Sequence, residues 1–68
     1  MTEVKKMQIR QANPGTYYLI LYVRNADECI ALDDDGFLAK MLTRVVGTWE
    51  VVENADVDNF LEKVFKNL

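Results

Sequence analysis

Apolar and polar residues alternate near the start of the chain, as they do along a strand with one buried face. Met7 and Ile9 point to one side of this segment, and Lys6 and Arg10 point to the other. We therefore predict a half-buried strand over residues 4–11, with its basic side chains on the solvent face.

The second predicted strand, Thr16 to Arg24, is apolar on both faces. A turn at Asn13-Pro14-Gly15 precedes it, because proline suits the first central position of a type II turn and glycine tolerates positive φ at the second. One face carries Tyr17, Leu19, Leu21 and Val23, and the other carries Tyr18, Ile20 and Tyr22. A strand of this kind is typically central in its sheet and covered on both sides.

A third, short strand is predicted at residues 28–32, and the run Asp33-Asp34-Asp35-Gly36 after it has two interpretations. It can be a hairpin loop, with residues 37–42 returning as a strand. Alternatively, an aspartate caps a short helix over residues 36–43. The Asp-Gly pair between apolar runs favours the hairpin, whereas the Ala, Lys, Met and Leu content favours the helix. We prefer the hairpin.

The rest of the chain divides into a valine-rich segment and an amphipathic helix. Arg44 to Glu53, with an internal Gly47, predicts either a strand bulged at the glycine or two short strands. Asn54 or Asp56 can cap the helix that follows. Its apolar residues recur at helical spacing: Val57, Phe60, Leu61, Val64, Phe65 and Leu68.

These elements predict an α+β fold in a single small domain over residues 1–68. The sheet is an antiparallel β-meander of four to five strands, and the C-terminal helix packs on one face. One helix covers one face, so Tyr18, Ile20 and Tyr22 on the other face need a second cover. That cover is the rest of the core, a second copy of the chain or a foreign partner. Trp49 is open to the same three alternatives.

The amino-acid composition excludes several kinds of catalytic and metal-binding site. The chain has 68 residues, no His, no Ser and one Cys. No Ser-His-Asp or Cys-His arrangement can form within it, and the histidine ligands of zinc are missing. Cys29 excludes an internal disulfide, and we expect it to be a small buried side chain. A calcium loop aligned on Gly36 fails, because Ala31 and Leu42 stand at ligand positions. We predict no catalysis, no cofactor and no metal.

Charge is distributed unevenly along the chain. The total is −3, yet the part through Arg24 carries a balance of +3 and residues 25–58 carry −7. One interpretation is a nucleic-acid site, with Lys6 and Arg10 beside stacking tyrosines. The other is an acidic patch that faces a basic protein surface and is formed by Asp33, Asp34, Asp35, Glu50, Glu53 and Asp56.

We therefore expect a non-enzymatic protein-binding module, homodimeric, that acts as a small accessory or inhibitory protein of phage or mobile-element type by occluding a partner's surface. Its candidate contacts are Tyr18, Ile20, Tyr22, Asp33, Asp34, Asp35 and Trp49. The alternative is a nucleic-acid-binding module that uses Lys6 and Arg10. The part of the chain through Arg24 has only four cations, which would attract a phosphate backbone weakly. No apolar run is long enough to span a membrane, and residues 1–6 do not resemble a signal peptide. We expect a cytoplasmic protein.

Overall fold

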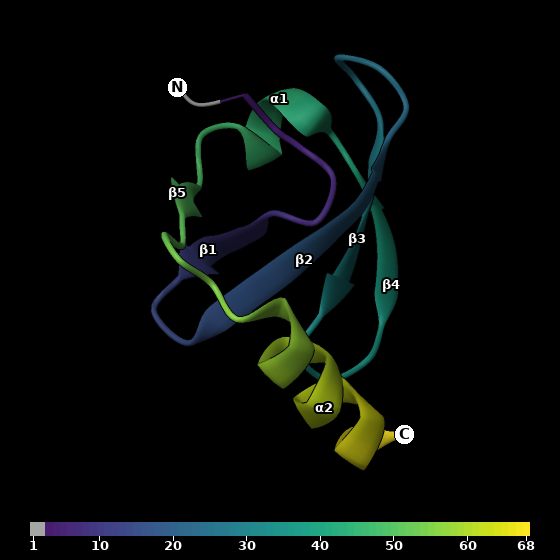
Figure 1. The fold of residues 1–68 in the computed structure, drawn as a ribbon. Helices are drawn as coiled ribbons and strands as arrows, with labels where there is room; N and C mark the ends of the chain where they lie inside the picture. Colours follow the sequence, from purple (N-terminus) through teal and green to yellow (C-terminus); the bar gives the residue numbers. More distant parts are fainter. Residues whose placement is uncertain (1–2) are drawn as a thin grey trace.

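Residues 3–68 are described by the computed structural model, and they form a five-stranded antiparallel sheet with one helix on each face (Figure 1). The strands are β1 (Ile9–Asn13), β2 (Thr16–Val23), β3 (Cys29–Asp33), β4 (Leu38–Met41) and β5 (Glu50–Val51), and the helices are α1 (Thr43–Val46) and α2 (Val57–Asn67). The strand order is β4-β3-β2-β1-β5, so the first four strands are a meander. The predicted α+β fold with a C-terminal helix is confirmed.

The chain wraps the sheet on both sides. Because β4 and β5 are the two edges, the connection between them crosses the sheet, and it carries α1. Val46 of α1 packs against Ile20 in one core cluster. The chain then crosses the opposite face as α2, where Phe60 packs against Leu19 in a second cluster. Strand β2 therefore lies at the centre with a core on each face, as predicted.

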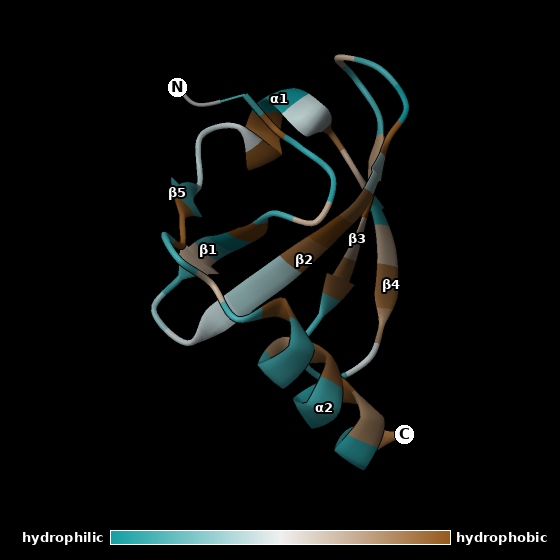
Figure 2. Ribbon diagram, viewed as in Figure 1, coloured by the Kyte–Doolittle hydropathy of each residue, from teal (hydrophilic) through white to brown (hydrophobic). Residues whose placement is uncertain are grey.

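The hydropathy of the elements follows this layering. Figure 2 shows β2 brown along much of its length and the outward-facing side of α2 teal. Phe60 and Val64 are the buried residues of α2, on the side that faces the sheet. The carboxylate of Asp56 accepts a hydrogen bond from the backbone N–H of Asn59 at 3.0 Å, which caps the helix. The predicted helix is confirmed, and Asp56 rather than Asn54 is its cap.

A β-bulge at Leu21 changes which residues of β2 share a face. Ile20 pairs with Ala31, but the next pair on β3 is Tyr22 with Ile30, so one residue of β2 is extra. A bulge of this kind reverses the side-chain alternation beyond it. Tyr22 therefore lies on the α2 face of the sheet, and the prediction that it shares a face with Ile20 is wrong.

The acidic run forms a hairpin loop. The carboxylate of Asp33 accepts hydrogen bonds from the backbone N–H groups of Asp35 and Phe37, both at 2.9 Å. Gly36 takes the positive φ of 97° that closes the loop. Strand β4 then pairs with β3, so the hairpin is confirmed and the helix over residues 36–43 is wrong.

Two segments differ from their predicted form. Residues 44–53 are neither a bulged strand nor two short strands, since the chain makes α1 and a turn and is extended as a strand only at β5. The reason is a long-range contact, because the buried side chain of Arg10 binds carbonyl groups of this segment. The first strand begins at Ile9 rather than Val4, after an irregular stretch in which Met7 has a φ of 67°. Neither helix of residues 3–68 has the length and apolar character needed to cross a bilayer.

Candidate partner-binding surfaces

Arg10 is a core residue rather than a surface cation. Its side chain is wholly buried. The guanidinium donates hydrogen bonds to the carbonyl groups of Glu3, Val46, Gly47 and Trp49 and to the side-chain oxygen of Gln8, over distances of 2.8 to 3.4 Å. The prediction that Arg10 lies on an exposed basic face is therefore wrong. A nucleic-acid site would retain only Lys6, which is exposed.

Burial has an electrostatic cost for this residue. Desolvation lowers the pKa of Arg10 from its ordinary value, because the charged form loses its water. Carbonyl oxygens replace that water, and hydrogen bonds to a charged donor are stronger than neutral ones. Arg10 thus joins β1 to the segment that crosses the sheet.

Ile20 is also core. It has no exposed surface and packs with Cys29, Ala31 and Val46. A residue in this position cannot meet a partner, so the prediction that Ile20 is a contact residue is wrong. The sequence did not decide what covers the face of β2 that carries Ile20. In the structure, α1 and the residues that follow it cover this face.

The three aspartates of the predicted acidic patch lie together at the β3–β4 turn. Asp33 serves the turn itself, as described above. The carboxylate of Asp34 lies 3.4 Å from the ammonium nitrogen of Lys63, so it ties the turn to α2. Asp35 is exposed. Two of the three carboxylates therefore have partners within the chain, and the acidic surface is smaller than predicted.

The rings of Tyr18 and Trp49 stack, with centroids 5.2 Å apart and planes inclined by 23°. Beside them is a hollow of about 320 Å³, which we call the aromatic groove. It is lined by Tyr18, Met41, Leu42, Val45, Val46 and Trp49. Leu42 and Val45 at its mouth are 47% and 43% exposed. Two predicted contact residues thus meet in an apolar groove on the α1 face.

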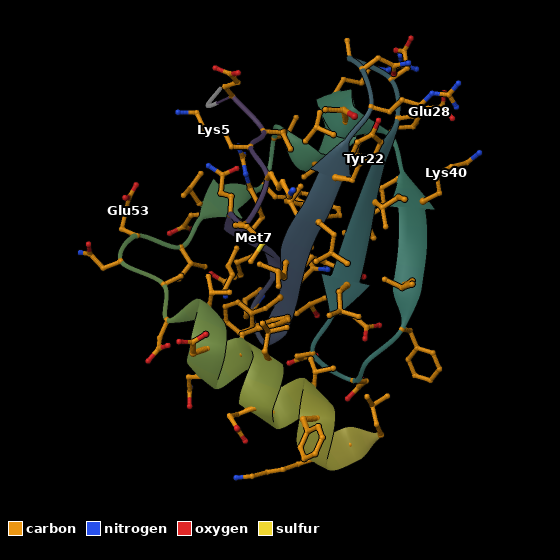
Figure 3. All side chains as sticks on the ribbon, turned by 45° about the vertical axis from the view of Figure 1, so that its right-hand side comes forward. Lys5, Met7, Tyr22, Glu28, Lys40 and Glu53 are labelled. Carbon is orange, nitrogen blue, oxygen red and sulfur yellow. The ribbon has the colours of Figure 1, made fainter. Side chains whose placement is uncertain are left out.

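A second hollow, of about 210 Å³, lies on the opposite face, around Tyr22. We call it the Tyr22 surface; its lining is Tyr22, Arg24, Glu28, Cys29, Ile30 and Lys40. Tyr22, Glu28 and Lys40 lie toward the same end of the sheet, away from α2 (Figure 3). Glu28 is 3.6 Å from Arg24 and 3.5 Å from Lys40, measured between charged atoms.

Sequence reasoning missed Ile30 and the mouth of the aromatic groove. For Ile30 a signal was available, because β3 reads Cys-Ile-Ala-Leu and is apolar on both faces, as β2 is. For Leu42 and Val45 there was no such signal, since a valine-rich run predicts a strand and the groove requires a helix here.

Comparisons of this chain with protein-family models, with curated proteins and with solved structures give no match. Among residues 3–68, no three His, Cys, Asp or Glu side chains are grouped closely enough to hold a metal ion. The two surfaces must therefore be interpreted from their own geometry.

Proposed function

We propose that the chain is a non-catalytic protein-binding module that holds its partner on the Tyr22 surface. One observation carries the proposal: an apolar patch lies uncovered beside three charged side chains, those of Arg24, Glu28 and Lys40. Tyr22 is 52% exposed and its cross-strand neighbour Ile30 is 38% exposed. Figure 3 shows Tyr22 at the end of the sheet away from α2. An apolar centre with a polar rim is the usual anatomy of a protein interface.

The framework under this surface supports the proposal. Tyr22, Ile30 and Lys40 are cross-strand neighbours on β2, β3 and β4, which are hydrogen-bonded to one another. Strand pairing fixes the backbone that carries these side chains before binding, so little backbone ordering free energy is lost when a partner docks. Tyrosine also tolerates water when the partner is absent, because its hydroxyl can remain hydrated.

The rim gives the partner a definite chemistry. Arg24 and Lys40 share a single carboxylate, that of Glu28, so the rim has one positive charge in excess. Ion pairs this exposed contribute little to the stability of the fold. Arg24 and Lys40 can therefore leave Glu28 and pair with a carboxylate of a partner instead. We expect the partner to place an apolar side chain on Tyr22 and Ile30, with a carboxylate beside it.

In this proposal the module acts by occupying its partner's surface, as a small accessory or inhibitory protein does. Such a role requires contact area and charge complementarity rather than catalytic groups. The lone Cys29 is buried, and a single thiol suits a reducing compartment, so we expect this binding to occur in the cytoplasm.

Affinity capture from the source cells tests the proposal. The tagged chain would be compared with Tyr22→Thr, which removes the ring but keeps a strand-forming residue. The matched control is Phe65→Ala, because Phe65 is 72% exposed on α2, away from the Tyr22 surface. We expect one protein to be retained by the wild type and the control and to be lost from Tyr22→Thr, with or without nuclease treatment. Equal retention by all three chains would contradict the proposal, and loss on nuclease treatment would favour nucleic-acid binding.

A further inference from the structure

We propose that a second copy of this chain pairs along β4 and inserts its Phe37 into the aromatic groove. The groove lies on the face opposite the Tyr22 surface, and the paired edge shares Lys40 with the rim of that surface. Phe37→Ser tests the dimer and Tyr22→Thr tests the proposed function, so the failure of one can be told from the failure of the other. Three features of the structure support it: an open strand edge, an exposed aromatic ring at the start of that edge and an apolar groove at its end.

The open edge is β4, the outermost strand of the sheet on the right of Figure 1. The N–H of Asp33 donates to the carbonyl of Phe37 at 3.0 Å, which sets the phase of the β3–β4 ladder. Hydrogen bonding alternates along an antiparallel pair, so Ala39 and Met41 bond toward β3. Leu38 and Lys40 therefore direct their backbone N–H and C=O groups to the open edge, where another strand can bind them.

Two-fold symmetry and the charge of Lys40 select one register for that pairing. With the axis at Ala39, Leu38 of one copy lies opposite the partner's Lys40, and the outward backbone groups of both copies meet. Moving the axis to Lys40 would place two ammonium groups directly opposite each other, which is destabilising. Moving it to Leu38 would bring Gly36 into the pairing and shorten the paired segment. The axis at Ala39 is the favourable choice.

This register brings the partner's Phe37 to the aromatic groove. Met41 lies opposite the partner's Phe37, because both are two residues from the axis. Side chains alternate along a strand, so Phe37 and Met41 project to the α1 face, where the groove is. Phe37 is 70% exposed in the single chain, so most of its surface is free to enter a groove. There the ring would enter the end of the groove that Met41, Leu42 and Val45 line, because Cys29, opposite Met41, and Asp33, opposite Tyr18, are four residues apart along β3.

Charge complementarity supports the same arrangement. The register carries the partner's acidic turn, with its exposed Asp35, toward Arg44 in α1. Arg44 is two-thirds exposed, and its guanidinium lies 2.7 Å from Asp27 at the other end of the sheet. Opposite charges that approach across an interface help to fix its register. By symmetry this approach of the acidic turn to Arg44 occurs twice in the dimer. The exposed Asp35 would then help to fix the register of the interface.

Sedimentation equilibrium of the full chain tests the dimer. Five paired residues of each chain, 37–41, and two inserted rings make an interface near the low end of the usual range, about 1,200 Å² in total. We therefore expect dissociation between about 1 and 100 µM, which the experiment should bracket. Phe37→Ser should raise the dissociation constant at least about tenfold, as expected for an anchor residue. Phe65→Ser, at an equally exposed ring on α2, should leave it unchanged.

Engineered cysteines test the register. In the proposed dimer the two Ala39 residues face each other across a non-hydrogen-bonded pair, about 4.5 Å apart at Cα, which a disulfide can span. Mild oxidation should therefore link Ala39→Cys chains into dimers and should leave Leu38→Cys chains largely monomeric. A chain that is monomeric at every concentration overturns the proposal. So does a dimer that Phe37→Ser leaves intact, or faster linking of Leu38→Cys than of Ala39→Cys.

Discussion

The Nη1 atom of Arg10 lies 3.0 Å from the carbonyl oxygen of Trp49, so a buried cation of β1 binds the backbone that leads into β5. The same nitrogen reaches the carbonyl groups of Val46 and Gly47. These carbonyls belong to the end of α1 and the turn after it, and buried carbonyls must find donors. One side chain thus satisfies the backbone of the segment that covers the α1 face.

Replacing Arg10 should therefore unfold the domain rather than weaken a surface function. We expect Arg10→Ala to lower the free energy of unfolding by about 3 kcal/mol or more, because several buried carbonyls lose their donor. In a small domain, this can abolish the cooperative transition. Urea unfolding monitored by Trp49 fluorescence measures the change. Lys6→Ala, at an exposed cation, should stay within about 0.5 kcal/mol of the wild type, and equal effects of the two substitutions would contradict the role given to Arg10.

The bulge at Leu21 predicts that two neighbours in β2 differ sharply in their contribution to stability. Ile20→Ala removes a fully buried side chain and should cost about 2 to 5 kcal/mol. Tyr22→Thr truncates a half-exposed ring and should cost less than about 1 kcal/mol. Thermal unfolding of both variants measures the difference. Similar losses would mean that Tyr22 lies in the same core as Ile20, as an unbulged strand requires.

Alanine substitutions at two glycines with positive φ, Gly15 and Gly36, allow the cost of backbone strain to be measured apart from the cost of a steric contact. Gly15 has a φ of 84° and open space where a Cβ would lie, whereas at Gly36 a Cβ would lie 3.2 Å from a methyl carbon of Leu68. Gly15→Ala should cost about 1 kcal/mol from strain alone, and Gly36→Ala should cost more. Removing Leu68 should reduce the difference, which chemical denaturation can follow. If Gly36→Ala proved no worse than Gly15→Ala, the end of α2 would not pack against the β3–β4 turn.

Asp33 should behave as a turn residue rather than as part of an acidic docking site. Asp33→Ala removes the acceptor for two backbone N–H groups and should cost about 0.5 to 2 kcal/mol, the range measured for comparable side-chain caps. Asp33→Asn keeps an acceptor oxygen and should recover most of that loss. Asp35→Asn is the control for charge alone. A loss in Asp33→Asn as large as that in Asp33→Ala would show that charge, not the hydrogen bonds, matters here.

The sequence predicts most of the fold because most of its signals are local. The two apolar faces of β2, the turn at Pro14-Gly15, the hairpin at Gly36 and the amphipathic α2 each follow from neighbouring residues. The segment over residues 44–53 does not, because its valines favour a strand while a side chain 36 residues earlier binds its carbonyl groups. No local pattern reports a contact of that range.

The candidate site was predicted in part for the same reason. Tyr18 and Trp49 were identified as aromatic contact residues, and the structure brings them together. Tyr22 was placed on the wrong face because no glycine marks the bulge at Leu21, so alternation appeared to continue. Arg10 was taken for a surface cation because strand alternation alone cannot distinguish solvent from a face that a later segment covers.

Photo-crosslinking in the source cells addresses the proposed protein-binding function. A benzophenone amino acid would replace Arg24, on the rim of the Tyr22 surface, or Glu62, an exposed position on α2. We predict that irradiation links a protein to the Arg24 position and not to the Glu62 position, and that adding Tyr22→Thr to the same chain abolishes the product. Crosslinking that is equal at the two positions, or that survives Tyr22→Thr, would contradict binding through this surface.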